Sequence, residues 1–119
     1  MESKDALEFL PLSATDFQLL LSLSNGGLHG YAISKAVKEA SCGRVRIGLG
    51  SLYRIIARLS NTGLVEECEA EEEPAAEGAP RRRYRLTTLG RAVLRAEVGR
   101  LSDAVEVARS SQLFVDPGA

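Results

Sequence analysis

The residues best suited to chemistry in this sequence are arginines gathered in two acid-free stretches. Residues 40–65 hold four arginines and residues 78–96 hold six, whereas residues 66–77 between them hold seven glutamates and no basic residue. A guanidinium is a planar fork of N–H donors that matches phosphate oxygens and the guanine edge. The net charge is only −1, but local charge decides whether a phosphate backbone is attracted. The pattern therefore favours contact with nucleic acid at these two stretches.

The first stretch is predicted to contain one helix with two different faces, over residues 50–62 of the string GLGSLYRIIARLSNTG. Apolar residues recur at i, i+3, i+4 and i+7 and form one stripe: Leu52, Ile55, Ile56 and Leu59. The opposite side is small, polar and basic: Gly50, Arg54, Ala57, Arg58 and Asn61, with Ser51 and Tyr53 on the two rims. Such a helix suits the DNA major groove. Because an ordinary surface helix shows the same two faces, this stretch alone does not decide between the two interpretations.

The elements around this helix predict a winged helix-turn-helix. A helix is expected over about residues 13–24, capped by Ser13 and strengthened at its start by Asp16. A second is expected over residues 30–40, with an inner side made of Tyr31, Ile33, Ala36, Val37 and Ala40. Residues 45–47 alternate like a short strand, and residues 64–68 and 81–86 form a β-hairpin, the wing, around a flexible loop at 69–80. The fold class is mainly α with a small β-hairpin. It comprises an N-terminal arm (1–12), a DNA-binding domain (13–88), a dimerisation helix (89–115) and a tail (116–119).

The last helix, capped by Thr87 or Thr88, is expected to run to about Ser111 and to pair with a second copy. Five of its residues are spaced 4, 3, 4 and 3, as in the a and d positions of a coiled coil: Leu94, Val98, Leu101, Val105 and Ala108. We call these five residues the seam. At 1.5 Å per residue the helix is ~36 Å long, too long to pack wholly on this small domain. Part of the seam should therefore meet another chain.

The sequence contains three strings that, in this order, resemble the PadR-like transcriptional regulators: LHGYAISKAV (28–37), GLGSLYRIIARLSNTGLVE (48–66) and RRRYRLTTLGRAVL (81–94). The resemblance implies a homodimeric winged-helix repressor that binds double-stranded operator DNA of near-palindromic sequence. It places the chain in the short subgroup with a single C-terminal helix, and it makes residues 50–62 the recognition helix. The chain departs from the family pattern at Gly48 and Leu49, where a Ser-Pro helix start is common, and at Arg54, where a proline is common.

The expected DNA contacts fall in both basic stretches. Arg54 and Arg58 are the best candidates to read base edges, although a phosphate contact suits each of them equally well. Gly50 and Ser51, at the start of the recognition helix, suit an anion. The remaining candidates are Tyr53, Asn61, His29 and the wing arginines Arg81, Arg82 and Arg83. The alternative for the wing arginines is a solvated run paired with the glutamates at 66–77, and for Tyr53 it is packing against the second helix. Asn61 suits a cap at the end of the recognition helix, and His29 suits capping or packing.

Other functions find less support in the sequence. One histidine and two distant cysteines assemble no nucleophile–base pair and no metal cluster, so neither catalysis nor a cofactor is expected. No apolar run reaches the ~20 residues of a membrane span, which favours a cytoplasmic protein. A small-molecule effector between the last and first helices would be lined by Phe9, Phe17 and Phe114, which suit a core or an interface equally well. The alternative function is a winged-helix module that binds a protein partner and no DNA.

Overall fold

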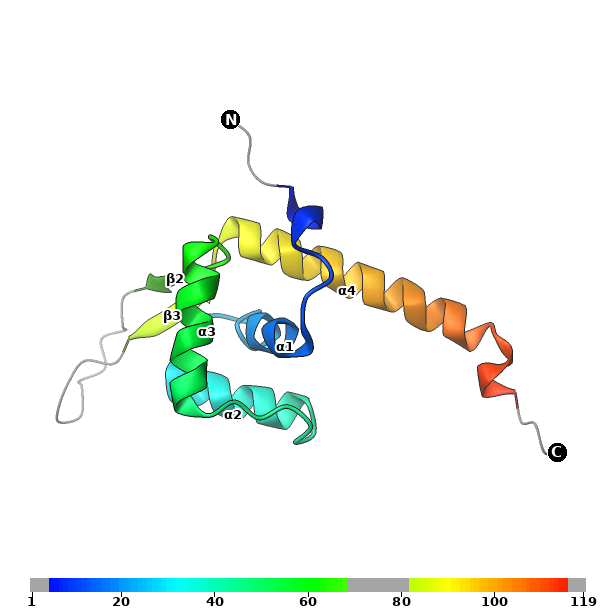
Figure 1. Ribbon diagram of the computed structural model, residues 1–119, viewed down its shortest axis with the longest axis horizontal. Coiled ribbons are helices and arrows are strands. Elements are labelled where there is room, and N and C mark those ends of the chain that lie inside the picture. The colour runs from blue at the N-terminus through cyan, green and yellow to red at the C-terminus, as the bar shows by residue number, and fades with distance from the viewer. Residues whose placement is uncertain (1–4, 69–81, 116–119) are drawn as a thin grey trace.

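The computed structural model describes residues 5–68 and 82–115 of the chain (Figure 1). In chain order the elements are η1 (Ala6–Phe9), α1 (Ala14–Ser22), β1 (Leu28–His29), α2 (Gly30–Ala40), α3 (Leu49–Asn61), β2 (Val65–Cys68), β3 (Arg83–Leu86), α4 (Thr88–Arg109) and η2 (Gln112–Phe114). The prediction of a mainly α fold with a small β element is confirmed. The wing loop at 69–80, Arg81 and the tail at 116–119 lie outside the described residues.

Local hydroxyl caps begin α1 and α4. The Ser13 hydroxyl accepts a hydrogen bond from the Asp16 amide, and the Thr87 hydroxyl accepts one from the Gly90 amide. Each bond satisfies a backbone donor that has no partner within its own helix. Both caps agree with the residues expected from the sequence, with Thr87 rather than Thr88 at the start of α4.

The two ends of α3 differ. Its N-cap residue, Gly48, makes no side-chain capping bond, which agrees with the weak start expected from its sequence. Its C-terminus is a Schellman motif, in which Gly63 has a φ of +86° and the Leu64 amide donates to the Leu59 carbonyl at 2.9 Å. The chain therefore turns tightly out of α3 and passes directly into β2.

The sheet has three antiparallel strands in the order β1-β3-β2. Leu28 of β1 lies opposite Tyr84 of β3, and Val65 of β2 lies opposite Leu86. The hairpin of β2 and β3 is the predicted wing. The third strand of the sheet, β1, comes from the segment just before α2, and it was not predicted from the sequence.

The strand predicted at 45–47 is wrong. Hydroxyls of α2 and its C-cap bond the backbone of this segment: the Val45 amide donates to Ser41 Oγ at 2.9 Å, and the Ser34 hydroxyl donates to the Ile47 carbonyl at 2.9 Å. Because these backbone groups already have side-chain partners, the segment has no need of a strand ladder. It forms the loop that leads from α2 into α3.

One hydrophobic core joins the three N-terminal helices, the sheet and the start of α4. Its buried residues include Leu19, Leu20, Ile33, Val37, Leu52, Ile56, Leu59, Leu64, Val93 and Leu94. The inner side predicted for α2 is correct at Ile33 and Val37 but wrong at Tyr31, which is 70% exposed, and at Ala40, which is also exposed. α2 buries its i, i+3 and i+7 positions from Gly30, and Tyr31 lies one residue, about 100°, away from that stripe.

α4 is packed on the domain along its first half and projects from it along its second (Figure 1). Its buried residues are Gly90, Val93, Leu94 and Glu97. Beyond Glu97, Leu101 and Ala108 are half-buried and the other described residues are exposed. The projection raises the radius of gyration to 17.1 Å, against ~13 Å for a compact domain of about 100 residues.

The N-terminal arm docks on the first half of α4. The Leu12 amide donates to Glu97 Oε2 at 3.0 Å, and Arg100 Nε donates to Glu97 Oε1 at 2.6 Å. Glu97 is only 1% exposed. Arg100, helped by the Leu12 amide, holds the pKa of Glu97 below its ordinary value, although burial opposes this effect. The buried carboxylate thus joins the arm to α4 through two partners.

The proposed effector trio does not come together in the chain. Phe9 and Phe17 pack partly buried against the core, whereas Phe114 lies on η2 and is 67% exposed. Figure 1 shows η1 beside the first half of α4 and η2 at its far end. The expected pocket lined by all three aromatic residues is therefore wrong for a single chain. Among the helices in the described part of the chain, none combines the length and apolar character needed to span a membrane.

Candidate nucleic-acid interface

The outward face of α3 is exposed and carries no acidic residue. Leu52, Ile56 and Leu59 bury the other face, and Ile55 is half-buried at its edge. The exposed residues include all those expected from the sequence, Gly50, Ser51, Tyr53, Arg54, Ala57, Arg58 and Asn61, together with Leu49 and Ser60. The two-faced helix is therefore confirmed, and its basic side is open to a ligand.

The first half of the exposed face is built around Arg54. Its Nη2 donates to the Ser51 hydroxyl at 3.3 Å, one helical turn earlier. Within the described chain, that neutral hydroxyl is the partner of the Arg54 guanidinium, so the full positive charge faces outward. Ser51 lies in the first turn of a helix that has no side-chain cap at Gly48. The positive charge of Arg54 and the partial positive charge at the N-terminus of α3 therefore favour an anion on the same side of the helix.

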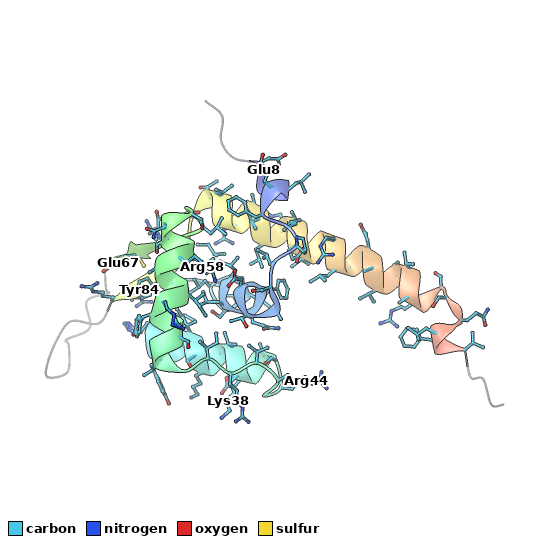
Figure 2. All side chains as sticks on the ribbon, viewed as in Figure 1. Glu8, Lys38, Arg44, Arg58, Glu67 and Tyr84 are labelled. Carbon is cyan, nitrogen blue, oxygen red and sulfur yellow. The ribbon has the colours of Figure 1, made fainter. Side chains whose placement is uncertain are left out.

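The second half of the exposed face is different, because Arg58 is paired with an acid. Its Nη2 and Nη1 donate to Oδ1 and Oδ2 of Asp16 at 2.8 and 3.1 Å. The bond to Asp16 raises the pKa of Arg58. Figure 2 shows Arg58 projecting from α3. From the sequence, Asp16 was expected only to strengthen the start of α1. Nothing local in the sequence shows that this carboxylate reaches α3.

Tyr53 packs against the start of α2. A Cβ added at Gly30 would lie 2.7 Å from Tyr53 Cζ, so only glycine leaves room for this ring. Tyr53 is nevertheless 47% exposed, and Tyr31, which follows Gly30 on α2, is 70% exposed. The packing alternative for Tyr53 is thus present in the structure without removing the residue from the surface. Tyr31 was not among the expected surface residues.

The wing arginines have unequal surroundings. Arg82 is exposed and its Nε lies 3.6 Å from Glu67 Oε2. Arg83 is half-buried, and its Nη2 donates to the Gly27 carbonyl at 3.0 Å, so it ties β3 to the turn before β1. Figure 2 places Glu67 beside Tyr84 on the sheet. Burial, followed by the nearby Glu67 carboxylate, raises the pKa of Tyr84. Arg82 is the described wing arginine that most resembles the expected surface contact.

His29 and Asn61 stand at helix ends. His29 occupies the N-cap position of α2 without a side-chain capping bond, and it is half-buried in β1 opposite Arg83. Asn61 is the last residue of α3 and is exposed, while the neighbouring Thr62 hydroxyl donates to the Leu59 carbonyl at 3.1 Å. Thr62, rather than Asn61, therefore caps the end of the helix.

The helix pair, the exposed α3 and the hairpin define a winged helix-turn-helix protein. The family model described as "Transcriptional regulator PadR-like family" matches residues 19–96. The chain therefore belongs to the PadR-like family of transcriptional regulators, and the family expected from the three sequence strings is confirmed.

Similar proteins are found both by sequence and among solved structures. An uncharacterized 37.1 kDa protein in transposon TN4556 of Streptomyces fradiae is 37% identical over 99 residues, which cover 79% of this chain. The match spans only 26% of that relative. A transcriptional regulator from Clostridium thermocellum is 24% identical with a TM-score of 0.64, over 98% of this chain and 100% of that one. A PadR family transcription regulator from Clostridium difficile is 19% identical with a TM-score of 0.66, over 82% and 97% of the two chains.

Proposed function

We propose that this chain is a repressor that binds a near-palindromic operator in double-stranded DNA as a homodimer. The observation that carries the proposal is the exposed, acid-free face of α3, anchored by three buried residues on its opposite side. A helix of this form fits the B-DNA major groove, where a few side chains meet the base edges. The family assignment supports the same role.

Arg54 is the proposed reader of base edges. Its guanidinium retains its full charge, and the bond to Ser51 at 3.3 Å restrains its direction. A bidentate arginine–guanine contact contributes ~1–3 kcal/mol of discrimination against a wrong base. The amides at Gly50 and Ser51 would meet a phosphate at the helix start. Tyr53, Asn61, Arg82 and His29 are secondary candidates, and Arg81 belongs to this proposal from its sequence alone.

The homodimer is supported by the projecting half of α4. Val98 is 44% exposed, Val105 is 50% exposed, and both belong to the seam. An apolar stripe on a projecting helix is best covered by the same stripe of a second copy. Two-fold symmetry would then present two copies of α3 to successive major grooves ~34–36 Å apart, which requires a near-palindromic operator.

The test is fluorescence anisotropy with duplexes from the chain's own promoter region, at two salt concentrations. We expect promoter DNA to bind with a steep salt dependence, because phosphate contacts release counterions. Arg54→Ala should reduce promoter affinity ~10-fold or more, since 1.4 kcal/mol is tenfold, and should leave the unfolding temperature unchanged.

The control is Arg91→Ala, which removes an exposed arginine from α4 rather than from α3. It should retain promoter affinity within about twofold, since it lies outside the reading helix. If the wild-type chain shows no salt-sensitive affinity for any such duplex, the protein-interaction module becomes the better interpretation. If Arg54→Ala binds the promoter as the wild type does, α3 is not the reader.

A further inference from the structure

The paired arginine on α3 carries an inference that rests on the proposed function and extends it. We propose that Asp16 of α1 is a specificity-determining residue of the DNA interface. Its carboxylate covers the outer end of the Arg58 guanidinium and cancels that charge. Arg58 then offers DNA only its Nε edge, and it adds nothing to the general attraction for phosphate.

The geometry of the pair is end-on and bidentate. Both terminal nitrogens of Arg58 donate to Asp16, one to each carboxylate oxygen, at 2.8 and 3.1 Å. This arrangement is the strong form of an arginine–carboxylate contact. It leaves the Nε–H and the outer N–H beside it as the only edge on which two parallel bonds can still form. Arg58 can therefore still meet a guanine edge, but from one side only.

Asp16 is held in place independently of Arg58. Its amide donates to the Ser13 hydroxyl at 3.0 Å, within the first turn of α1. The Asp16 side chain is only 13% exposed, whereas that of Arg58 is 54% exposed. A helix N-terminus also favours a negative charge at this position. Asp16 is therefore held in one position, and the more exposed Arg58 side chain adopts the conformation that meets it.

The pairing should persist on DNA. If Arg58 swung to a phosphate, it would leave Asp16 unpaired, largely buried and close to the negative backbone. Arg54 has no such restraint, because its described partner is the neutral Ser51 hydroxyl. The two arginines of one helix would therefore act differently. Arg54, the proposed base reader in the operator, also contributes its charge to the attraction for any sequence, whereas Arg58 acts only where its remaining edge fits a base.

The experiment measures how binding to random-sequence and promoter duplexes depends on salt. Asp16→Asn keeps the shape of the side chain but removes its charge. We expect it to steepen the plot of log K against log salt for random DNA by ~0.9 for each chain in the complex, because each freed arginine neutralises one phosphate. Affinity for random DNA should rise more than affinity for the promoter, so the ratio of the two should fall.

The decisive variant is the double substitution Asp16→Asn with Arg58→Ala, which restores the neutral charge of the pair. It should show the wild-type salt slope on random DNA. The matched control, Arg54→Ala, should lower that slope by ~0.9 for each chain. A double variant whose slope falls as it does for Arg54→Ala would overturn the inference, because Arg58 would then be neutralising a phosphate in the wild type.

A readout without DNA separates this inference from the proposed function. The unfolding temperatures of the wild type, Asp16→Asn, Arg58→Ala and the double variant form a cycle that measures the coupling of Asp16 and Arg58 in the free protein. We expect a favourable coupling, and additive effects would overturn the inference even if DNA binds. Failure of the wild type to bind promoter DNA would overturn the proposed function while leaving that coupling intact.

Discussion

The two halves of α4 share one apolar stripe but have opposite surroundings. Along the first half, Gly90, Leu94 and Glu97 are buried by the domain and the N-terminal arm. Along the second half, the same side of the helix continues through Val98 and Val105, which are about half exposed. The stripe is continuous because positions three and four apart lie on one face. The periodicity of the sequence therefore identifies an apolar face of α4. The extent of the folded domain determines which part of that face is buried within the same chain.

This comparison corrects one member of the seam. Leu94 is only 6% exposed and packs in the chain's own core, so its assignment to the dimer interface is wrong. The spacing of 4, 3, 4 and 3 does not distinguish a residue buried within the chain from one available to a partner. The residues that remain available for the proposed dimer are Val98, Leu101, Val105 and Ala108.

The largest expected effect comes from a substitution in the packed first half of α4. Gly90→Ala would place a Cβ 2.9 Å from the carbonyl carbon of Leu64 and closer still to its oxygen, and backbone atoms cannot move aside cheaply. We expect a loss of about 3 kcal/mol or more in the free energy of unfolding. Urea denaturation measures it. Gly99→Ala is the control in the projecting half, where nothing lies within 4 Å of the added Cβ. It should stabilise by ~0.5–1 kcal/mol through helix propensity, and equal effects at both sites would contradict the comparison.

The next effect concerns the projecting half. Replacing Leu101 and Val105 together with Asp should convert the proposed dimer into monomers, because it places unpaired charges in an apolar contact. Weakening of the dimer on the order of 100-fold, or ~2.7 kcal/mol, would be visible by multi-angle light scattering. The far-UV circular dichroism should stay unchanged.

Asp103→Lys is the matched control for this pair of substitutions, since residue 103 is exposed and lies on the opposite side of the helix from Leu101. It should leave the molar mass as in the wild type. A wild-type chain that is monomeric at all concentrations would refute the dimer proposal.

The smallest effect concerns the junction of the two halves. Glu97→Gln keeps a hydrogen-bond acceptor for Leu12 but loses the charged pair with Arg100, and should cost ~1–3 kcal/mol near pH 7. The lowered pKa of Glu97 gives the sign of the pH dependence. Its stabilisation is complete above the ordinary glutamate pKa of ~4.3 and is lost as the pH falls through the lower value of the folded state.

Urea midpoints of the wild type and the variant should therefore converge as the pH is lowered from about 5 to 3. The exposed Glu106 gives the control substitution, Glu106→Gln, which should stay within ~0.5 kcal/mol of the wild type. A constant difference between wild type and Glu97→Gln across this pH range would contradict the assigned role of the carboxylate.

The sequence predicts well what depends on neighbours along the chain. The bounds of α2, the Ser13 and Thr87 caps and the turn at Gly63 all follow from periodicity and capping within a few residues. The outward face of α3 follows for the same reason. The family strings agree with these signals, since each string covers one element or the junction of two.

What the sequence did not predict depends on distant partners. Arg58 meets an acid 42 positions away, and Glu97 meets a backbone amide 85 positions away. Arg83 was expected on the DNA side, but its guanidinium bonds a carbonyl 56 positions away. The strand β1 has only two residues, too few for alternation to reveal it. For the three charged side chains, the residue type indicated a polar contact, but the partner became known only from the fold.

The contact at Gly90 would have a consequence for the spacing of the proposed operator. Leu64, whose backbone it touches, follows α3 directly through the turn at Gly63. The segment that leaves α3 is therefore packed backbone against backbone on α4 at this point, because Gly90 has no side chain to separate it from Leu64. In a dimer built along the projecting half of α4, each chain would hold its α3 at a fixed distance from the two-fold axis. The distance between the two copies of α3 would then equal the separation of the two operator half-sites. The operator length would then be encoded in the length and tilt of α4, far from any residue that touches a base.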